Sequence, residues 1–238
     1  RTWAYGHIVV DEAQELSPMQ WRLLMRRFPM KSFTVVGDIA QASSASAASS
    51  WSQALEPFVG ERFTLEELTI NYRTPAQIAD AAVAVAREAG YEVSAPRAVR
   101  EGQWAPFIHQ VPQEHVVTET VQRVSDEVAL GDGALIGVVC SPAQYTQVAR
   151  AVMETHADRT GTAEDAVENQ VLVLTPWEAK GLEFDVVIIV EPQQLLDDAQ
   201  GAVGDLYVSM TRPTQRLHLV GTSMPAGLGA EAAGSAQS

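Results

Sequence analysis

Short apolar runs alternate along this chain with segments of helical period, and this alternation limits the possible folds more than any other feature. Strands are predicted at residues 7–10, 33–36, 62–65, 107–111, 135–140, 171–174, 185–190 and 217–220. Helices are predicted between them, at residues 18–28, 75–89, 114–130, 142–156 and 205–211. Strands that alternate with helices form parallel sheets covered by helices, so the sequence predicts an α/β fold with a mostly parallel sheet.

The predicted strands fall into two parts of the chain, separated by a stretch around residues 68–73. Residues 1–70 contain too few strands for a complete doubly wound domain, whereas residues 71–222 can form a second α/β unit. Residues 223–238 are small and polar and predict a disordered tail. Because the first residue is Arg1 rather than Met, we expect the chain to be a piece of a longer protein.

Charge and cysteine content restrict the classes of partner. The chain has 16 Lys and Arg against 30 Asp and Glu, which gives a formal net charge of −14. That charge disfavours a broad electrostatic grip on nucleic acid phosphates, although a local basic groove formed with further domains stays compatible with it. The single cysteine, Cys140, cannot form an internal disulfide, and no apolar run is long enough to span a bilayer. We therefore expect a cytoplasmic protein with no membrane partner.

Two of the predicted strands end in polar residues that suit phosphate chemistry. The first is followed by Asp11 and Glu12, and the second leads into Gly37, Asp38 and Gln41. Parallel sheets gather ligands at the carboxyl ends of their strands. In nucleotide hydrolases one such carboxylate holds Mg²⁺ while another orients the attacking water. Taken alone, the Gly-Asp pair is equally compatible with an ordinary exit from a strand into a turn.

Three later segments carry further candidates, each with a structural alternative. Arg73 could reach a γ-phosphate and the ring of Tyr72 could stack on a base, or the two could be a surface arginine and an anchoring tyrosine. Gly181 allows close backbone approach and Glu183 could accept a ribose hydroxyl, or both could belong to a simple turn. Arg212 is a second candidate arginine, or a cation that compensates a helix dipole. The five histidines show no metal-ligand spacing, and we assign them no role.

Taken in order, these segments resemble the superfamily 1 helicases of the UvrD/Rep type. The resemblance extends over about residues 7–220 and compares motifs II to VI of that family with IVVDEAQ, VVGDIAQ, ELTINYR, LTPWEAKGLEFD and LYVSMTRPTQRL. It implies two RecA-like domains of the P-loop NTPase type with ATP bound between them. The chain would then comprise a piece of the first RecA-like domain and the whole of the second. The implied cofactors are ATP and Mg²⁺.

The resemblance also assigns roles to the residues of motifs II and III. It implies that Asp11 holds Mg²⁺, that Glu12 is the catalytic base and that Gln41 senses the γ-phosphate. The family also requires a glycine-rich loop that ends in GK[ST], whose lysine grips the β- and γ-phosphates. The only lysines here are Lys31 and Lys180, and neither follows a glycine. We therefore expect the chain to need a P-loop domain from the rest of the protein and to be inactive alone.

Motifs IV to VI receive roles on the same basis. The resemblance implies that Tyr72 stacks near the adenine and that Arg73 and Arg212 stabilise the transferred phosphoryl group. It implies that Gly181 and Glu183 bind the cofactor, with the glutamate at the ribose. The intact protein is accordingly expected to be an ATP hydrolase of the DNA helicase family.

Departures from the family pattern narrow the resemblance. A stretch of Ala and Ser, residues 42–50, which predicts a loop or a weak helix, precedes Trp51 where motif III usually continues into aromatic residues. Trp177 and its neighbours replace the usual histidine of motif V. Both changes fall on the side that binds nucleic acid. With GDIAQ, EAKGLEFDVVIIVEP and TRPTQRL, they resemble the actinobacterial branch of HelD, a family of helicase-like ATPases that bind RNA polymerase and help release it from nucleic acid.

The sequence is compatible with three functions. The first is a HelD-type factor whose partner is RNA polymerase, and the second is a UvrD/Rep-like helicase that translocates on DNA and unwinds it. The third is an α/β interaction domain without catalysis. Retention of both acids, both arginines and the motif III glutamine weakens the third, while the acidic charge and the altered motif III favour the first.

Overall fold

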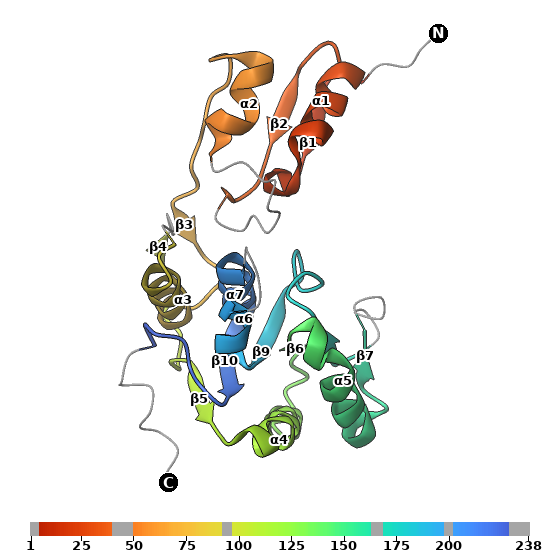
Figure 1. The fold of residues 1–238 in the computed structure, drawn as a ribbon, viewed down its shortest axis with the longest axis vertical. Coiled ribbons are helices and arrows are strands. Elements are labelled where there is room, and N and C mark those ends of the chain that lie inside the picture. Colours follow the sequence, from red (N-terminus) through yellow and green to blue (C-terminus); the bar gives the residue numbers. More distant parts are fainter. Residues whose placement is uncertain (1–4, 40–49, 92–96, 163–168, 198–201, 229–238) are drawn as a thin grey trace. The chain divides into compact units, whose positions relative to one another are not determined.

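The computed structural model describes residues 5–39, 50–91, 97–162, 169–197 and 202–228. The chain divides into two compact units, Arg1–Glu67 and Leu68–Ser238, which we call unit 1 and unit 2. The division falls beside the stretch at residues 68–73 that separates the two parts in the sequence. Each unit has its own secondary structure and apolar core (Figure 1).

Unit 1 contains two parallel strands and two helices. Its elements are β1 (Ile8–Val10), η1 (Ala13–Glu15), α1 (Pro18–Arg27), β2 (Phe33–Val35) and α2 (Trp51–Val59). The strands pair in register, with Val9 opposite Thr34. The core consists of Ala13, Trp21, Met25, Ala54 and Leu55. One helix-covered pair of parallel strands is therefore the scaffold that carries the polar residues of this unit.

A capping box explains the start of helix α1. Ser17 and Gln20 form a capping box at α1, in which the Gln20 N–H donates to Ser17 Oγ at 3.3 Å and the Ser17 N–H to Gln20 Oε1 at 2.7 Å. Helix α2 was not predicted, because Pro57 lies inside it and small residues precede it.

The strand predicted at residues 62–65 is wrong. Phe63 packs on the core from an irregular segment, and within the described residues no strand pairs with it.

Unit 2 is built on a six-stranded sheet in which every pair is parallel. Its strands are β5 (Phe107–Gln110), β6 (Ile136–Val139), β7 (Thr160–Gly161), β8 (Val171–Leu174), β9 (Phe184–Val190) and β10 (Pro213–Gly221). Their order is β5-β10-β9-β6-β8-β7. The register places Ile188 between Val138 and His218. The sequence predicts five of these strands to within a few residues, and β7 was missed because it has two residues.

Unit 2 contains helices, most of which pack against this sheet. They are α3 (Ala76–Glu88), α4 (Val116–Ala129), α5 (Pro142–His156), α6 (Pro192–Asp197) and α7 (Ala202–Met210). Val124 of α4 and Val148 of α5 share an apolar cluster with alternate strand residues such as Val186 and Ile188. Helix α7 contacts β9 and packs on α3 and α6, while β3 (Ile70–Asn71) and β4 (Arg97–Ala98) form a separate parallel pair (Figure 1). No helix among the described residues is long and apolar enough to cross a membrane.

A buried polar network joins α4 to β10 and β5. The Glu127 carboxylate accepts a hydrogen bond from Arg216 Nε at 2.8 Å and lies 2.8 Å from His218 Nε2. Arg216 also donates to Asp132 Oδ2 at 3.0 Å, and His218 Nδ1 lies 3.1 Å from His109 Nε2. His109 and His218 are far apart in the sequence, and only the pairing of β5 with β10 brings them together. Their spacing in the sequence therefore gave no sign of this contact. The network satisfies a carboxylate and a guanidinium that are each less than a tenth exposed.

Stability should fall at acid pH because of His109. Burial and the neighbouring His218 lower the pKa of His109 to about 4, whereas the unfolded value is near 6.5. Below pH 6.5 the unfolded chain therefore binds a proton that the folded chain excludes, so this contribution is complete above pH 6.5 and is lost as pH falls towards 4. We expect a loss of about 2 kcal/mol at pH 5. Urea unfolding at pH 7.5 and 5 measures it, and His109→Asn should show a smaller loss; an equal loss would contradict this origin.

Candidate functional site

The polar residues of unit 1 lie together where its two parallel strands end. Asp11 and Glu12 follow β1 directly, and both are exposed. The exits of the two strands are joined through the backbone, because the Val36 N–H donates to the Val10 carbonyl at 2.8 Å and the Ala13 N–H to the Val36 carbonyl at 3.0 Å. The carboxylates therefore lie at the carboxyl ends of parallel strands, as the sequence predicts.

Glu12 has an unusual backbone conformation. Its φ of 48° and ψ of 39° fall in the left-handed region, which a non-glycine residue seldom adopts. Its N–H donates to Asp11 Oδ1 at 2.9 Å. Residues held in such conformations cost about 1–3 kcal/mol and cluster at functional sites. The hydrogen bond ties the Asp11 carboxylate to the Glu12 backbone.

Gln14 is a site residue that the sequence reasoning missed. Its side chain is buried, its Nε2 donates to Glu12 Oε2 at 2.6 Å, and its Oε1 accepts from the Asp38 N–H at 3.2 Å. The available signal was a glutamine placed two residues after the second acid. Only the pairing of the two strands shows that this side chain reaches the exit of β2.

Gly37 is needed for space. A Cβ at this position would collide with Gln14 Oε1 and would come within 3.0 Å of the Trp51 ring. Its φ is not in the left-handed region, so space rather than backbone conformation favours glycine here. The predicted γ-phosphate sensor Gln41, and most of the Ala/Ser stretch at residues 42–50, lie outside the described residues.

Arg73 and Glu183 form an ion pair in unit 2. Arg73 Nη2 lies 2.8 Å from Glu183 Oε1, and both side chains are about half exposed. Asn71 holds the Arg73 segment, because its Oδ1 accepts from the N–H groups of Arg73 at 2.9 Å and Thr74 at 3.3 Å. Tyr72, between them, is 70% exposed. Two residues that the resemblance assigns to one ligand are thus neighbours in space.

The second predicted arginine lies in a different environment. Arg212 is buried, and its Nε donates to the Val208 carbonyl at 3.2 Å, at the end of α7. The same helix end is tied to the Arg73 segment, because Thr74 Oγ1 donates to the Thr211 carbonyl at 3.0 Å. The contact with Val208 matches the structural alternative of a cation at a helix terminus.

Gly181 lies at a turn between β8 and β9 and has a φ of 74°. The turn is held by Glu178, whose Oε2 accepts from the Thr175 N–H and hydroxyl, each at 2.8 Å. Lys180 Nζ lies 3.6 Å from Asp205 Oδ1 and 5.1 Å from the ring centroid of Trp177. Left-handed geometry makes glycine the favoured residue at this position.

The groups present fit one metal ion and part of a nucleotide site. Among the described residues no cluster of three or more His, Cys, Asp or Glu could hold a metal. Mg²⁺ in nucleotide hydrolases is commonly bound by one or two carboxylates and the substrate phosphates, which the exposed Asp11 could serve. Neither lysine is placed for phosphate, because Lys31 Nζ donates to the Phe58 carbonyl at 2.9 Å and Lys180 lies beside Asp205.

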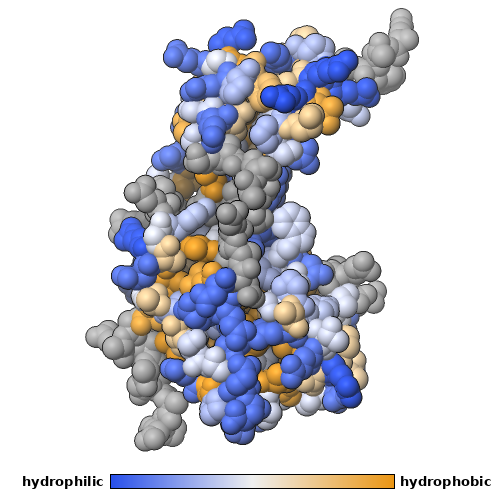
Figure 2. All heavy atoms as spheres, in the orientation of Figure 1, coloured by the Kyte–Doolittle hydropathy of each residue, from blue (hydrophilic) through white to orange (hydrophobic). Residues whose placement is uncertain are grey.

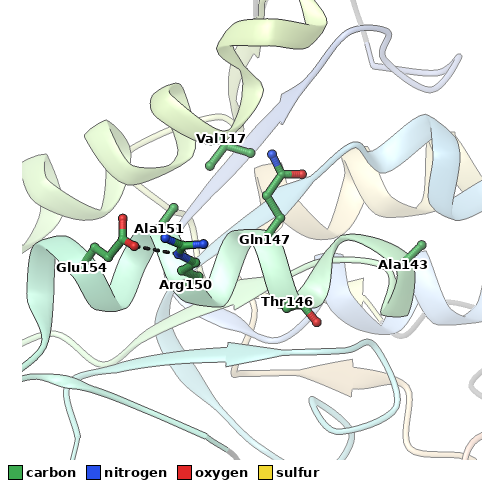
Figure 3. Close-up of a pocket in the computed structure, with 7 residues that line it drawn as sticks. All are labelled: Val117, Ala143, Thr146, Gln147, Arg150, Ala151 and Glu154. Atoms are coloured by element: carbon green, nitrogen blue, oxygen red, sulfur yellow. Dashed lines mark hydrogen bonds and ion pairs between the residues drawn. The ribbon is translucent and has the colours of Figure 1, made fainter.

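A shallow pocket of about 500 Å³ lies elsewhere in unit 2. It is lined mainly by α5, with α4 beside it, and contains the Arg150–Glu154 ion pair of 2.7 Å (Figure 3). Its lining residues are Val117, Ala143, Thr146, Gln147, Arg150, Ala151 and Glu154. None of them is a predicted site residue, so the chemistry is assigned to the strand ends rather than to this pocket.

A family model of the viral superfamily 1 RNA helicase core domain matches residues 3–221. The chain belongs to this superfamily 1 helicase family. No curated protein matches the chain. The C-terminal domain of a possible DNA helicase from Lactobacillus plantarum WCFS1 is 21% identical with a TM-score of 0.50, covering 68% of this chain and 96% of that domain. The PRRSV helicase is 15% identical with a TM-score of 0.47, covering 90% of this chain and 34% of that one.

These comparisons confirm the superfamily 1 resemblance and the α/β, RecA-like fold class. The Lactobacillus domain has the same fold, and the family match extends over both units. Helicases of this kind are ATP-hydrolysing enzymes that use a nucleotide and a metal ion. The matched range includes the acids that follow β1 in unit 1.

Proposed function

We propose that this superfamily 1 helicase chain is part of a HelD-type, ATP-driven factor that remodels RNA polymerase or releases it from nucleic acid. The observation that carries the ATP chemistry is the pair Asp11 and Glu12 at the carboxyl end of β1, with Gln14 joining Glu12 to the exit of β2. This is where parallel sheets bind their ligands. The acidic composition and the departures in motifs III and V support the HelD type.

In this proposal Asp11 binds Mg²⁺ and Glu12 orients the attacking water and takes its proton. When bound, the metal ion neutralises charge on the phosphates. The fixed backbone at Glu12 and the bond from Gln14 hold the base in one orientation before substrate arrives. Gln41 would act at the γ-phosphate. The phosphate-gripping lysine has to come from a P-loop domain, since the chain has no GK[ST] sequence.

Unit 2 supplies groups for phosphate, ribose and base. An exposed ion pair such as Arg73–Glu183 contributes about 0–1 kcal/mol, so a phosphate oxygen can replace the carboxylate at small cost. Release from Arg73 frees Glu183 to accept a ribose hydroxyl, and the exposed Tyr72 ring can stack on the base. Gly181 would let the backbone approach the cofactor. Arg212 would act on phosphate through its guanidinium group, whose Nε donates to the Val208 carbonyl in this structure.

RNA polymerase is the proposed partner because an acidic protein is poorly suited to hold nucleic acid along a broad surface. The net charge is −14, and hydrophilic side chains cover much of the visible face of each unit in Figure 2. Repulsion between the acidic side chains and nucleic acid phosphates favours a protein partner over a nucleic acid partner.

The second candidate is a UvrD/Rep-like DNA helicase, which is favoured by the description of the Lactobacillus domain as part of a possible DNA helicase.

A pull-down and an unwinding assay separate the two candidates. We expect the full-length protein to be retained on immobilised RNA polymerase, with ATP changing the retained amount at least about tenfold through a change in binding free energy of 1.4 kcal/mol or more. Strand separation of a tailed duplex by the same preparation should stay at the level seen without ATP. Robust unwinding without polymerase retention would instead assign the DNA helicase function.

A further inference from the structure

We propose that Gln14 is a positioning residue that holds the Glu12 carboxylate and couples it to the exit of β2. This inference rests on the proposed ATPase function of Glu12 and identifies how that site is organised. Gln14 is 3% exposed and follows β1 in the short helix η1. It lies between the two polar strand exits of unit 1 and makes a bond to each of them.

The chemistry of its two partners sets the orientation of the Gln14 amide. A carboxylate can only accept, so the amide nitrogen must face Glu12 Oε2, at 2.6 Å. A backbone N–H can only donate, so the amide carbonyl must face Asp38, at 3.2 Å. A flipped amide would place a donor against a donor and an acceptor against an acceptor. Only one orientation of the Gln14 amide therefore allows both hydrogen bonds.

The bond holds one oxygen of the Glu12 carboxylate and leaves the other for chemistry. Oε2 accepts from Gln14, while Glu12 Oε1 has no hydrogen-bond partner among the residues that the structure describes. Glu12 is exposed, so without the hydrogen bond from the Gln14 amide its carboxylate could rotate in solvent. Gln14 thus presents Oε1 as the oxygen that can take a proton from water.

Gly37 provides independent support for this arrangement. A Cβ at Gly37 would collide with Gln14 Oε1, so the backbone after β2 approaches this amide as closely as it can. The approach is reinforced by the hydrogen bond from the Ala13 N–H to the Val36 carbonyl, at 3.0 Å. A displacement of the Gly37–Asp38 peptide is therefore transmitted to Glu12 through one side chain.

The test measures steady-state ATP hydrolysis by the full-length protein that contains this chain. Gln14→Leu keeps the volume but removes both hydrogen bonds, and it should lower kcat about 10–100-fold while changing KM for ATP less than about twofold. Gln14→Glu keeps an acceptor for the Asp38 N–H but sets a second carboxylate beside Glu12. It should lower kcat and move the acidic limb of the kcat–pH profile to higher pH, because two adjacent carboxylates disfavour double ionisation.

The matched control is Gln20→Leu, which removes the exposed side-chain contacts that Gln20 makes in the α1 capping box of the same unit. It should lower the thermal midpoint while leaving kcat within about twofold, since a cap contributes to stability rather than to this site. If Gln14→Leu fails to fold, Gln14→Glu decides the matter. Wild-type kcat and pH profile in a folded Gln14 variant, alongside a Glu12→Gln variant without turnover, would overturn the role of Gln14 alone. Full turnover in Glu12→Gln would overturn the proposed function of Glu12 as well.

Discussion

Replacing Glu12 with Gln is expected to lower ATP turnover by the full-length protein by about 10²–10⁴-fold, the usual contribution of a general base. The substitution preserves volume, and the carbonyl of the new amide can still accept the hydrogen bond from Gln14 Nε2. The site geometry is therefore retained while the group that takes the proton from water is removed. Nucleotide affinity should stay within about threefold, because the phosphates are bound by other groups.

Phosphate release and equilibrium binding of a fluorescent ATP analogue measure the two quantities. Glu61→Gln, an exposed acid in the same unit, is the matched control and should leave turnover unchanged. The 238-residue chain without a P-loop domain provides the blank and should show no turnover. Wild-type turnover in Glu12→Gln would remove this residue as the base, whatever the nucleotide affinity.

Replacing Glu127 with Ala is expected to lower the free energy of unfolding of unit 2 by about 3–5 kcal/mol, the usual cost of removing one partner of a buried ion pair. Glu127 accepts from Arg216 and contacts His218, and all three side chains are less than a tenth exposed. Without the carboxylate, Arg216 keeps only the partly exposed Asp132 as an ionic partner among the described residues. The buried Arg216 guanidinium then loses one of its two carboxylate partners among the described residues.

Urea denaturation of the chain at pH 7.5 measures the loss. Glu154→Ala removes the carboxylate of an exposed pair with Arg150 and should change the free energy of unfolding by no more than about 0.5 kcal/mol. A loss below 1 kcal/mol in Glu127→Ala would mean that water reaches Arg216 and that the network contributes little. A loss equal to that of the control would lead to the same conclusion.

Elements with strong local signals were predictable from the sequence. Helix α5 and strand β8 have the predicted limits, because a Ser-Pro start and a short run of aliphatic residues agree with their tertiary surroundings. Helix α2 and the irregular segment around Phe63 were not predictable, since the core of unit 1 overrides weak local preferences there. Two-residue strands such as β7 carry too little pattern to be recognised.

The same distinction holds for the candidate site. Asp11 and Glu12 were predictable because they close an apolar run, and that position alone places them at a strand end. Gln14 was not, because its role depends on which strand lies beside β1. Neither the pairing of Arg73 with Glu183 nor the burial of Arg212 could be deduced, since both depend on how distant segments pack.

The strand order of unit 2 has a consequence for its assembly on the ribosome. Strand β10 is the last of the six in the chain, yet it lies between β5 and β9. Among the described strands it is the only neighbour of β5, which is synthesised first. Until residues 213–221 leave the exit tunnel, β5 has no partner and the apolar edge of β9 stays open. Nascent chains of this unit therefore expose an unpaired strand for most of their synthesis, which is when chaperones that bind extended apolar segments would act on them.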